Sequence, residues 1–242
     1  MTEARTKDQY NETMKEYELT DLVKRVKNVI DQNMESEGME AFGDVDTLSL
    51  EQVIRANMLP AAQLIEMSAS GEMLGEGEDI PTDGMASDPM YSSDIYKCKS
   101  VSLPKDFMRF MALRMSDWRK VVTEPIDDTH PMYAMQRSSV LSVRGNPQKP
   151  VVAIVHGGSG LVLEAYTTAE SSTVSVAKYI AKPSVNGGKV KLCPLLVDAI
   201  VYAAAYLVAN SYNAINQAQV FLSTAKSLAG IQSAQQPTNT EE

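Results

Sequence analysis

The most suggestive chemistry in the sequence lies at residues 156–160, where His156, Gly157, Gly158, Ser159 and Gly160 separate two apolar runs. A histidine and a serine among glycines could form an oxyanion loop. A serine nucleophile elbow needs the order G-x-S-x-G, however, and Leu161 stands where the last glycine belongs. The spacing instead predicts a turn that joins two antiparallel strands, VVAIV and LVLEAY, and an exposed loop position for His156.

The glycine-rich region and the later Gly188-Lys189 pair do not match a phosphate-binding motif. A P-loop would need a glycine where Pro183 stands and a serine or threonine after Lys189, where Val190 stands. The other histidine, His130, follows Asp127 and could form an acid–base pair with it or take part in a helix start. The helix start is favoured, because acidic and hydroxyl side chains before a His-Pro pair are ordinary capping residues.

The sequence predicts neither a metal site nor a cofactor. Cys98 and Cys193 are the only cysteines and belong to no ligand cluster. The spacing of Asp79, Asp83 and Asp88 does not match a calcium-binding loop. Because no nucleophile, metal cluster or phosphate loop is recognised, we expect the chain not to be an enzyme, with an unrecognised active site as the alternative.

Basic residues gather around the single tryptophan. Arg109, Arg114, Arg119 and Lys120 flank Trp118, a pattern that can bind single-stranded nucleic acid. A sequence pI of about 4.9 argues against a duplex-binding domain. Solvated strand faces are therefore favoured, and a nucleic-acid-binding module stays an alternative.

Charge is distributed unevenly along the chain, whose net charge is −9. Residues 1–95 hold 7 basic and 21 acidic side chains, whereas residues 96–242 hold 15 basic and 10 acidic ones. The excess of acidic side chains in residues 1–95 could form a solvated extension on a near-neutral core. It could also allow opposite faces of successive copies to meet, or form an acidic wall that faces nucleic acid without binding it. No signal-peptide core precedes residue 18, so we expect a protein made in a cytoplasm with reduced thiols.

Two helices are predicted in the first third of the chain, after a flexible terminus at residues 1–14. Apolar spacing indicates a helix over Thr20–Asn33, and Ser49 with Gln52 forms a capping box that starts a second helix. Pro60 should kink or break that helix, which continues to about Ala69. Residues 71–95 are rich in Gly, Pro and acidic residues, which is typical of a linker, a lid or an arm.

Short strands are expected from Tyr96 onward. The segments KCKSVSL, FMRFMALRM, WRKVV and TVSVAKYIA have alternating or β-branched character, and a short helix should begin near Pro131. An Asn-Gly turn is expected at Asn186. These segments predict a small antiparallel β region.

The longest predicted element is a single helix over 194–228, about 50 Å in length. Between Leu195 and Ala229 it carries only two charges, Asp198 and Lys226, and its apolar run of about 15 residues is too short to cross a bilayer. A helix that is apolar nearly all round needs cover from another subunit or from the two N-terminal helices. The candidate oligomer-interface residues are Ala203, Ala204, Tyr206, Leu207, Tyr212 and Phe221.

The expected fold class is α+β, a helical bundle with a long C-terminal helix plus a small antiparallel β region. It should form one domain over residues 15–230, followed by a disordered tail at 231–242.

One stretch resembles a known family. Leu103-Pro104-Lys105-Asp106-Phe107-Met108-Arg109, followed by Trp118-Arg119-Lys120-Val121-Val122, is similar to a segment in structural proteins of tailed bacteriophages, in particular virion proteins of crAss-like and related short-tailed phages. The segment at Tyr179–Pro183 and the Ala- and Tyr-rich C-terminal helix fit the same resemblance, which covers roughly residues 45–230.

The resemblance implies a non-enzymatic head-to-tail connector, also called an adaptor or ring protein. Such a protein forms a ring of about a dozen copies beneath the portal, in cyclic symmetry. The implied partners are further copies of itself, the portal protein, other tail or ring proteins, and genomic DNA that passes without specific binding; no membrane is involved. The implied location is the virion, after assembly in the host cytoplasm.

An acidic channel would let DNA slide, because each basic contact to phosphate adds affinity. The candidate channel-facing residues are Glu76, Glu78, Asp79, Asp83 and Asp88. The alternative is another virion component, such as a head-completion, tail-hub or cargo protein.

Overall fold

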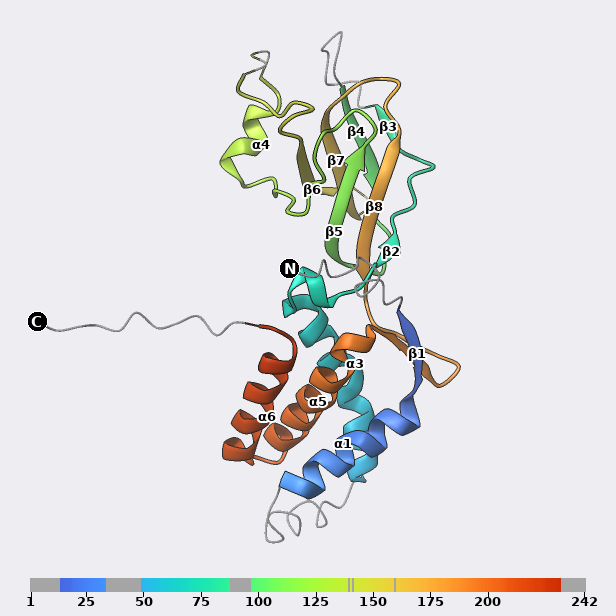
Figure 1. The fold of residues 1–242 in the computed structure, drawn as a ribbon, viewed down its shortest axis with the longest axis vertical. Coiled ribbons are helices and arrows are strands. Elements are labelled where there is room, and N and C mark those ends of the chain that lie inside the picture. Colours follow the sequence, from blue (N-terminus) through green and yellow to red (C-terminus); the bar gives the residue numbers. More distant parts are fainter. Residues whose placement is uncertain are drawn as a thin grey trace, which may run out of the picture. The chain divides into compact units, whose positions relative to one another are not determined.

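The chain forms two compact units. The computed structural model describes residues 14–33, 49–87, 97–138, 140, 142–158 and 160–231. Unit 1 comprises Met1–Glu76 and Pro183–Glu242, and unit 2 comprises Gly77–Lys182 (Figure 1). Unit 2 is therefore inserted into the sequence of unit 1, whereas the sequence predicted a single domain over residues 15–230. Most of the predicted flexible terminus and of the predicted tail lies outside the described residues.

The predicted fold class is wrong in its balance of helix and sheet. The described residues contain five α-helices together with three antiparallel sheets of three, three and four strands. Two of these sheets pack into a core of their own in unit 2. The β region is thus a substantial part of the chain and not a small addition to a helical bundle.

Unit 1 is built around one buried helix, α5 (Val197–Ser211). The other helices of the unit, α1 (Leu19–Asn33), α3 (Leu50–Ser68) and α6 (Ile215–Leu228), all contact α5 (Figure 1). The amphipathic spacing of α1 matches the prediction, since Leu22, Val23, Val26 and Ile30 are buried.

A small sheet and two 3₁₀ turns complete unit 1. The sheet has the order β1 (Lys15–Glu18), β10 (Lys189–Leu192), β9 (Val185–Asn186). The turns are η2 (Gly71–Met73) and η3 (Pro194–Leu196). The predicted Asn-Gly turn is confirmed between β9 and β10, where Gly187 and Gly188 have φ of 57° and 82°. Strand β1 was not predicted.

Helix α3 begins and ends where predicted, but it is not broken at Pro60. The Ser49 side chain accepts from the Gln52 amide, and the Gln52 side chain accepts from the Ser49 amide, which confirms the capping box. The helix runs through Pro60 to Ser68, so the predicted break is wrong. Proline removes one backbone donor, and the buried apolar residues on both sides of it, from Ile54 to Ile65, stabilise the helix against that loss.

The predicted 50 Å helix is wrong, because the chain turns back at Asn213. This residue has φ of 62°, in the left-handed region that asparagine tolerates better than most residues. The Ala214 amide donates to the Ala209 carbonyl at 2.9 Å, and the Asn213 amide donates to the Asn210 carbonyl at 3.1 Å. These two bonds form a Schellman motif that ends α5. Helix α6 then packs back on α5 and supplies cover that the sequence analysis had expected from another subunit or from the two N-terminal helices.

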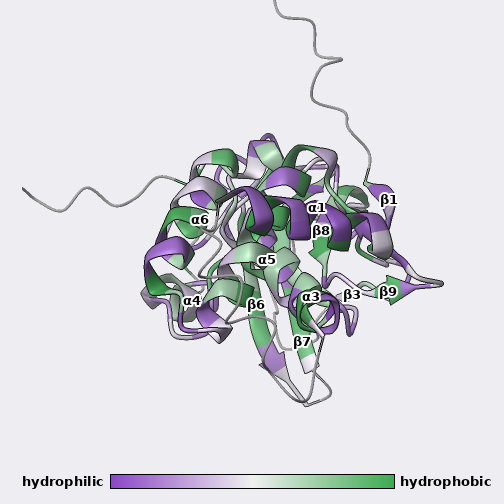
Figure 2. Ribbon diagram, turned by 90° about the horizontal axis from the view of Figure 1, so that it is seen from below, coloured by the Kyte–Doolittle hydropathy of each residue, from purple (hydrophilic) through white to green (hydrophobic). Residues whose placement is uncertain are grey.

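Helix α5 is apolar enough to resemble a membrane span. Among the described residues, Pro194–Ser211 meets the length and hydropathy of such a span, and 56 % of it is buried within the protein. A core helix meets the same criteria. In Figure 2 α5 takes pale to green hydrophobic colours, whereas much of α1 is purple and hydrophilic.

Unit 2 is a sandwich of two antiparallel sheets. One has the order β2 (Glu78–Asp79), β8 (Val174–Ala181), β5 (Phe107–Met115). The other has the order β3 (Ala86–Ser87), β4 (Lys97–Ser102), β7 (Gly160–Thr168), β6 (Val151–Gly157). Their facing side chains form one core that contains Phe110, Leu113, Trp118, Val152 and Leu163.

The second face of the four-stranded sheet is also covered. Cys98, Ala153, Val155 and Tyr166 form a smaller core there, against which Ile126 and Tyr133 pack. Tyr133 belongs to α4 (Pro131–Met135), the short helix predicted at Pro131. The predicted strand WRKVV is wrong, because Trp118 fills the main core and Val122 makes only a single bridge to Leu113.

Candidate functional site

The HGGSG stretch is a hairpin turn, as predicted. Strands β6 and β7 pair from Val151↔Tyr166 to Gly157↔Gly160, so the turn lies between Gly157 and Gly160. A Cβ on Gly157 would approach the Val162 Cγ2 to 2.7 Å, which explains the glycine there. His156 is exposed, as predicted, but it lies in β6 and pairs with Leu161 in the ladder, so the predicted loop position is wrong. Ser159 itself lies outside the described residues.

His130 takes part in a helix start, as predicted. Its Nδ1 accepts a hydrogen bond from the Met132 amide at 3.1 Å, which makes it the N-cap of α4. Asp127 accepts from the Thr129 amide at 2.8 Å and from the Thr129 hydroxyl at 2.6 Å. The Thr129 hydroxyl contributes most to holding the pKa of Asp127 below its ordinary value.

A cluster of polar side chains that the sequence did not reveal holds the loop between β7 and β8. Asp117 accepts from the Ala169 amide at 2.8 Å and from the Ser172 hydroxyl. Lys99, which is 9 % exposed, donates to the carbonyls of Glu170, at 2.9 Å, and of Ser172. A lysine, an aspartate and a serine could form a catalytic group, but here Lys99 binds backbone carbonyls and Asp117 binds a backbone amide and the Ser172 hydroxyl of one loop. The arrangement orders that loop next to the end of β7, where Thr167 has a strained φ of 60°.

Unit 1 buries a carboxyl group in its core. Glu66 of α3 is 1 % exposed, and burial raises its pKa to about 8, although the Cys193 amide acts in the opposite direction. Cys193 is also buried, and its thiol donates to the Met73 carbonyl at 2.9 Å. Neither side chain is open to solvent, so an acid and a thiol that could do chemistry together are enclosed in packing.

The basic–aromatic group of unit 2 does not form a stacking platform. Trp118 is 2 % exposed and lies in the sandwich core, where its Nε1 has no hydrogen-bond partner. Arg114, Arg119 and Lys120 are exposed around it. Base stacking needs an accessible aromatic face, so the arrangement gives the predicted single-strand site no ring to stack on.

The predicted interface residues divide into two groups. Ala203, Ala204 and Phe221 are at most 1 % exposed and are used by packing within unit 1, so they offer no surface to a second copy. Tyr206, Leu207 and Tyr212 are half-buried. The sequence placed all six on one long helix, but Phe221 lies on α6, beyond the turn at Asn213.

The outer face of α6 is a surface that the sequence did not single out. Its exposed apolar side chains are Ile215, Val220 and Leu228, with Val220 at 58 %. Its exposed polar side chains are all uncharged: Asn216, Gln219, Ser223 and Ser227. No charged residue occurs between Asp198 and Lys226, so Lys226 is the only charged residue of α6, although 22 % of the chain is charged. Depletion of charge is typical of the centre of a protein–protein interface.

The predicted channel residues do not lie on one structureless loop. Glu76 ends the first segment of unit 1, whereas Glu78 and Asp79 form β2 of unit 2. Asp79 pairs with Lys178 at 2.8 Å. Asp83 is exposed in a turn, and Asp88 lies outside the described residues. The loop predicted over residues 71–95 therefore contains a 3₁₀ turn and two short strands.

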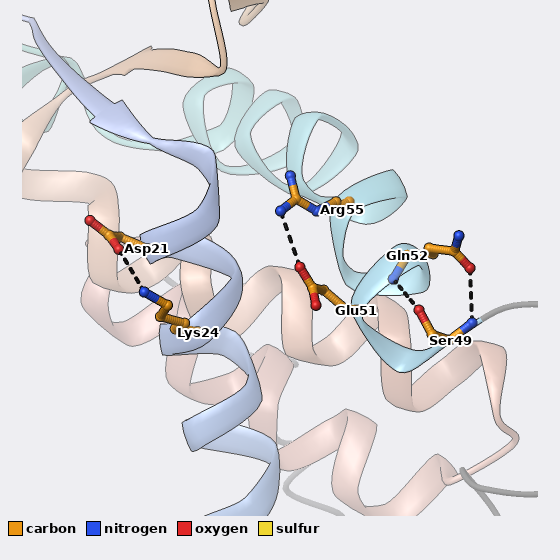
Figure 3. Close-up of polar contacts among 6 residues, drawn as sticks. All are labelled: Asp21, Lys24, Ser49, Glu51, Gln52 and Arg55. Atoms are coloured by element: carbon orange, nitrogen blue, oxygen red, sulfur yellow. Dashed lines mark hydrogen bonds and ion pairs between the residues drawn. The ribbon is translucent and has the colours of Figure 1, made fainter.

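A groove of about 490 Å³ lies between α1 and α3. It is lined by Thr20, Val23, Lys24, Lys27, Leu50, Glu51 and Ile54. Its apolar lining includes Val23 and Ile54, which are buried. Figure 3 shows the polar residues around it, with Lys24 paired to Asp21 at 3.3 Å and Arg55 paired to Glu51 at 3.1 Å. The groove could hold an apolar side chain between groups of opposite charge.

Among the residues that the structure describes, no three His, Cys, Asp or Glu side chains come together as a metal site. No protein-family model matches the chain, and no curated protein matches its sequence. Its function must therefore be inferred from its residues and its fold.

Proposed function

We propose that this chain is a structural protein of a tailed-phage virion: a connector whose copies form a ring at the junction of portal and tail, around the DNA channel. The outer face of α6 supports this proposal most. Helix α6 uses its inner face to cover α5 and still exposes Ile215, Val220 and Leu228 on a helix whose single charge is Lys226. Such a surface suits contact with another subunit better than contact with water.

The segment that resembles phage virion proteins has a structural role here, which also supports the proposal. Phe107 stacks on Tyr179 with ring centroids 5.9 Å apart, and the Tyr179 hydroxyl donates to Asp106 at 3.2 Å. Trp118 fills the core of the same sandwich. The matching residues therefore build unit 2, so the resemblance suggests a shared β-sandwich and no shared catalytic group.

We keep an acidic channel lining as part of the proposal, but with fewer candidate residues. Glu76 and Asp83 are exposed acidic residues, whereas Asp79 is paired with Lys178. Carboxylates at the channel would repel phosphate and so let DNA pass. Photo-crosslinking from packaged DNA tests this: we expect few crosslinks to residues 76–83, and strong crosslinks to them would contradict a repelling lining.

The test of the function is a phage that lacks this chain. We expect DNA to enter the heads and tails to be absent, because the tail then has no ring to join. Adding the purified chain to such heads should restore tail attachment. Normal tailed particles without the chain would overturn the proposal.

A further inference from the structure

Helix α3 also has an uncharged outer face, opposite the side chains that it buries in unit 1. Between Arg55 and Glu72 the only charged residue is Glu66, which is buried. Each member of this face has another member three or four residues along the helix, so all of them share one side of it. The exposed side chains of this face, here called the α3 face, are Ala56, Pro60, Gln63, Leu64 and Met67.

Most of the α3 face is apolar. Leu64 and Met67 are 40 % and 53 % exposed, and Ala56 and Pro60 continue the apolar surface toward the start of the helix. Depletion of charge is typical of the centre of a protein–protein contact, and methionine adapts its shape to a partner. Helix α1 exposes charged side chains along its length, so the absence of charge is not general to the surface of unit 1.

Helices α3 and α6 run in the same direction on different sides of α5. Both pack on α5, which lies between them in Figures 1 and 2. The residues that follow the two helices meet, because a Cβ on Gly230 would lie 3.7 Å from the Ser70 Oγ and 3.9 Å from the Met73 Cγ. The α3 face and the outer face of α6 both stay exposed, so neither covers the other within one copy.

Each of these two faces ends near one charge, and the two charges are opposite. Lys226 is the single charged residue of α6, and Glu72 is the first exposed acidic residue after the α3 face. Within the described part of the chain neither group forms an ion pair, whereas Glu51, at the other end of the α3 face, is paired with Arg55 at 3.1 Å. Parallel packing of the two faces would therefore bring Lys226 and Glu72 to the same end of the contact.

We propose that the α3 face of one copy packs against the outer face of α6 on the next copy, with the two helices parallel. The inference rests on the proposed ring, in which a rotation relates successive copies and two different faces meet. A rotation about an axis along the helices keeps their direction, so α3 and α6 of neighbouring copies stay parallel. The small side chains Ser223 and Ser227 on α6 leave grooves for the larger side chains of the α3 face.

Cysteine cross-linking of the purified full-length chain tests this contact. Leu64→Cys and Val220→Cys chains, one of them labelled with ¹⁵N, are mixed at high concentration and treated with a short bifunctional maleimide. The native Cys98 and Cys193 are 1 % exposed and should not react. We expect cross-linked pairs that contain one chain of each kind. In the control mixture Asn28→Cys, at an exposed position of α1, replaces Leu64→Cys and should give little product.

Two results would overturn the proposal. One is a yield no higher than that of the control mixture. The other is an equal yield from Val220→Cys alone, which would show that α6 binds the α6 of another copy.

Substitutions at the α3 face sharpen the test. Leu64→Glu should weaken self-association about tenfold, as loss of a central contact residue does. Leu195→Glu is a matched control, because Leu195 is 39 % exposed and lies outside the α3 face. Equal association of the two variants would contradict the contact. Tailless particles in the deletion phage, together with normal self-association of Leu64→Glu, would retain the function and remove only this contact.

A charge exchange tests the parallel arrangement. Lys226→Glu and Glu72→Lys should each weaken self-association about two- to fivefold, as loss of an exposed ion pair does. The chain that carries both substitutions should recover the original association, because the pair is then restored with its charges exchanged. Failure of the double variant to recover would contradict parallel packing of α3 on α6.

Discussion

Helices α1 and α6 both pack against α5, but their outer faces differ. Helix α1 exposes charged side chains along its length, and three of them form ion pairs: Lys24 with Asp21, and Arg25 with Asp198 of α5. Helix α6 exposes Ile215, Val220 and uncharged polar groups, and its single charge is Lys226. Both helices bury apolar side chains against α5, so the difference between their outer faces does not come from the packing of unit 1. It indicates that α1 faces water, and we propose that α6 faces another subunit.

The largest expected change in stability concerns α3, the third helix that packs on α5. Helix α3 places the carboxyl group of Glu66 in the core. Its Glu66 keeps a proton to about pH 8 in the folded chain, whereas the unfolded chain loses it near pH 4.5. Stability should therefore fall as pH rises from about 4.5 to 8, and level off above that, because the unfolded state binds fewer protons in this window. The loss attributable to Glu66 could reach about 5 kcal/mol.

Glu66→Gln should remove this dependence and raise stability at pH 8. Urea unfolding followed by circular dichroism at pH 5 and pH 8 measures both chains. An unchanged difference between the two pH values in the variant would show that Glu66 does not cause it.

The inner faces of α1 and α6 should matter to a similar degree. Phe221→Ala should lower the free energy of unfolding by about 3–5 kcal/mol, and Leu22→Ala by about 2–5 kcal/mol, because both side chains are 1 % exposed. Thermal and urea unfolding test this. A loss below about 1 kcal/mol for Phe221→Ala would mean that α6 is only loosely held on α5, and the comparison of outer faces would lose its basis.

The outer faces should respond differently to added charge. Val220→Glu on α6 should leave stability within about 0.5 kcal/mol of the original chain and weaken incorporation into particles about tenfold. Asn28→Glu, at an exposed position of α1, is the control and should change neither property. Equal incorporation of the two variants would contradict the assignment of α6 as a contact surface.

The smallest expected effect concerns the ion pair between Arg25 and Asp198. Both side chains are well exposed, so water screens their attraction. Asp198→Asn should cost less than about 1 kcal/mol, and that cost should shrink further in high salt. A larger or salt-independent loss in urea unfolding would show that α1 depends on this charge more than its exposure suggests.

Local patterns in the sequence were sufficient for several elements. The capping box at Ser49, the β6–β7 hairpin and the start of α4 at Pro131 depend on residues close together in the chain, and all three are confirmed. The end of α6 at Leu228, shortly before Gly230 with its φ of 65°, is of the same kind.

Non-local packing explains the failures. Asn213 favours the left-handed conformation, but asparagine also occurs inside helices, so this signal alone did not reveal the turn, which lets α6 cover α5. The Lys99 and Asp117 cluster joins segments more than 50 residues apart, and no spacing in the sequence reveals it. The outer face of α6 became visible only once the hairpin showed which residues point outward.

The most direct measurement is the copy number of this chain in purified virions, determined by quantitative mass spectrometry against the portal protein. A ring beneath the portal predicts about one copy for each portal subunit. A ratio far above one would point to a capsid or cargo protein, and absence of the chain from virions would contradict the proposed function.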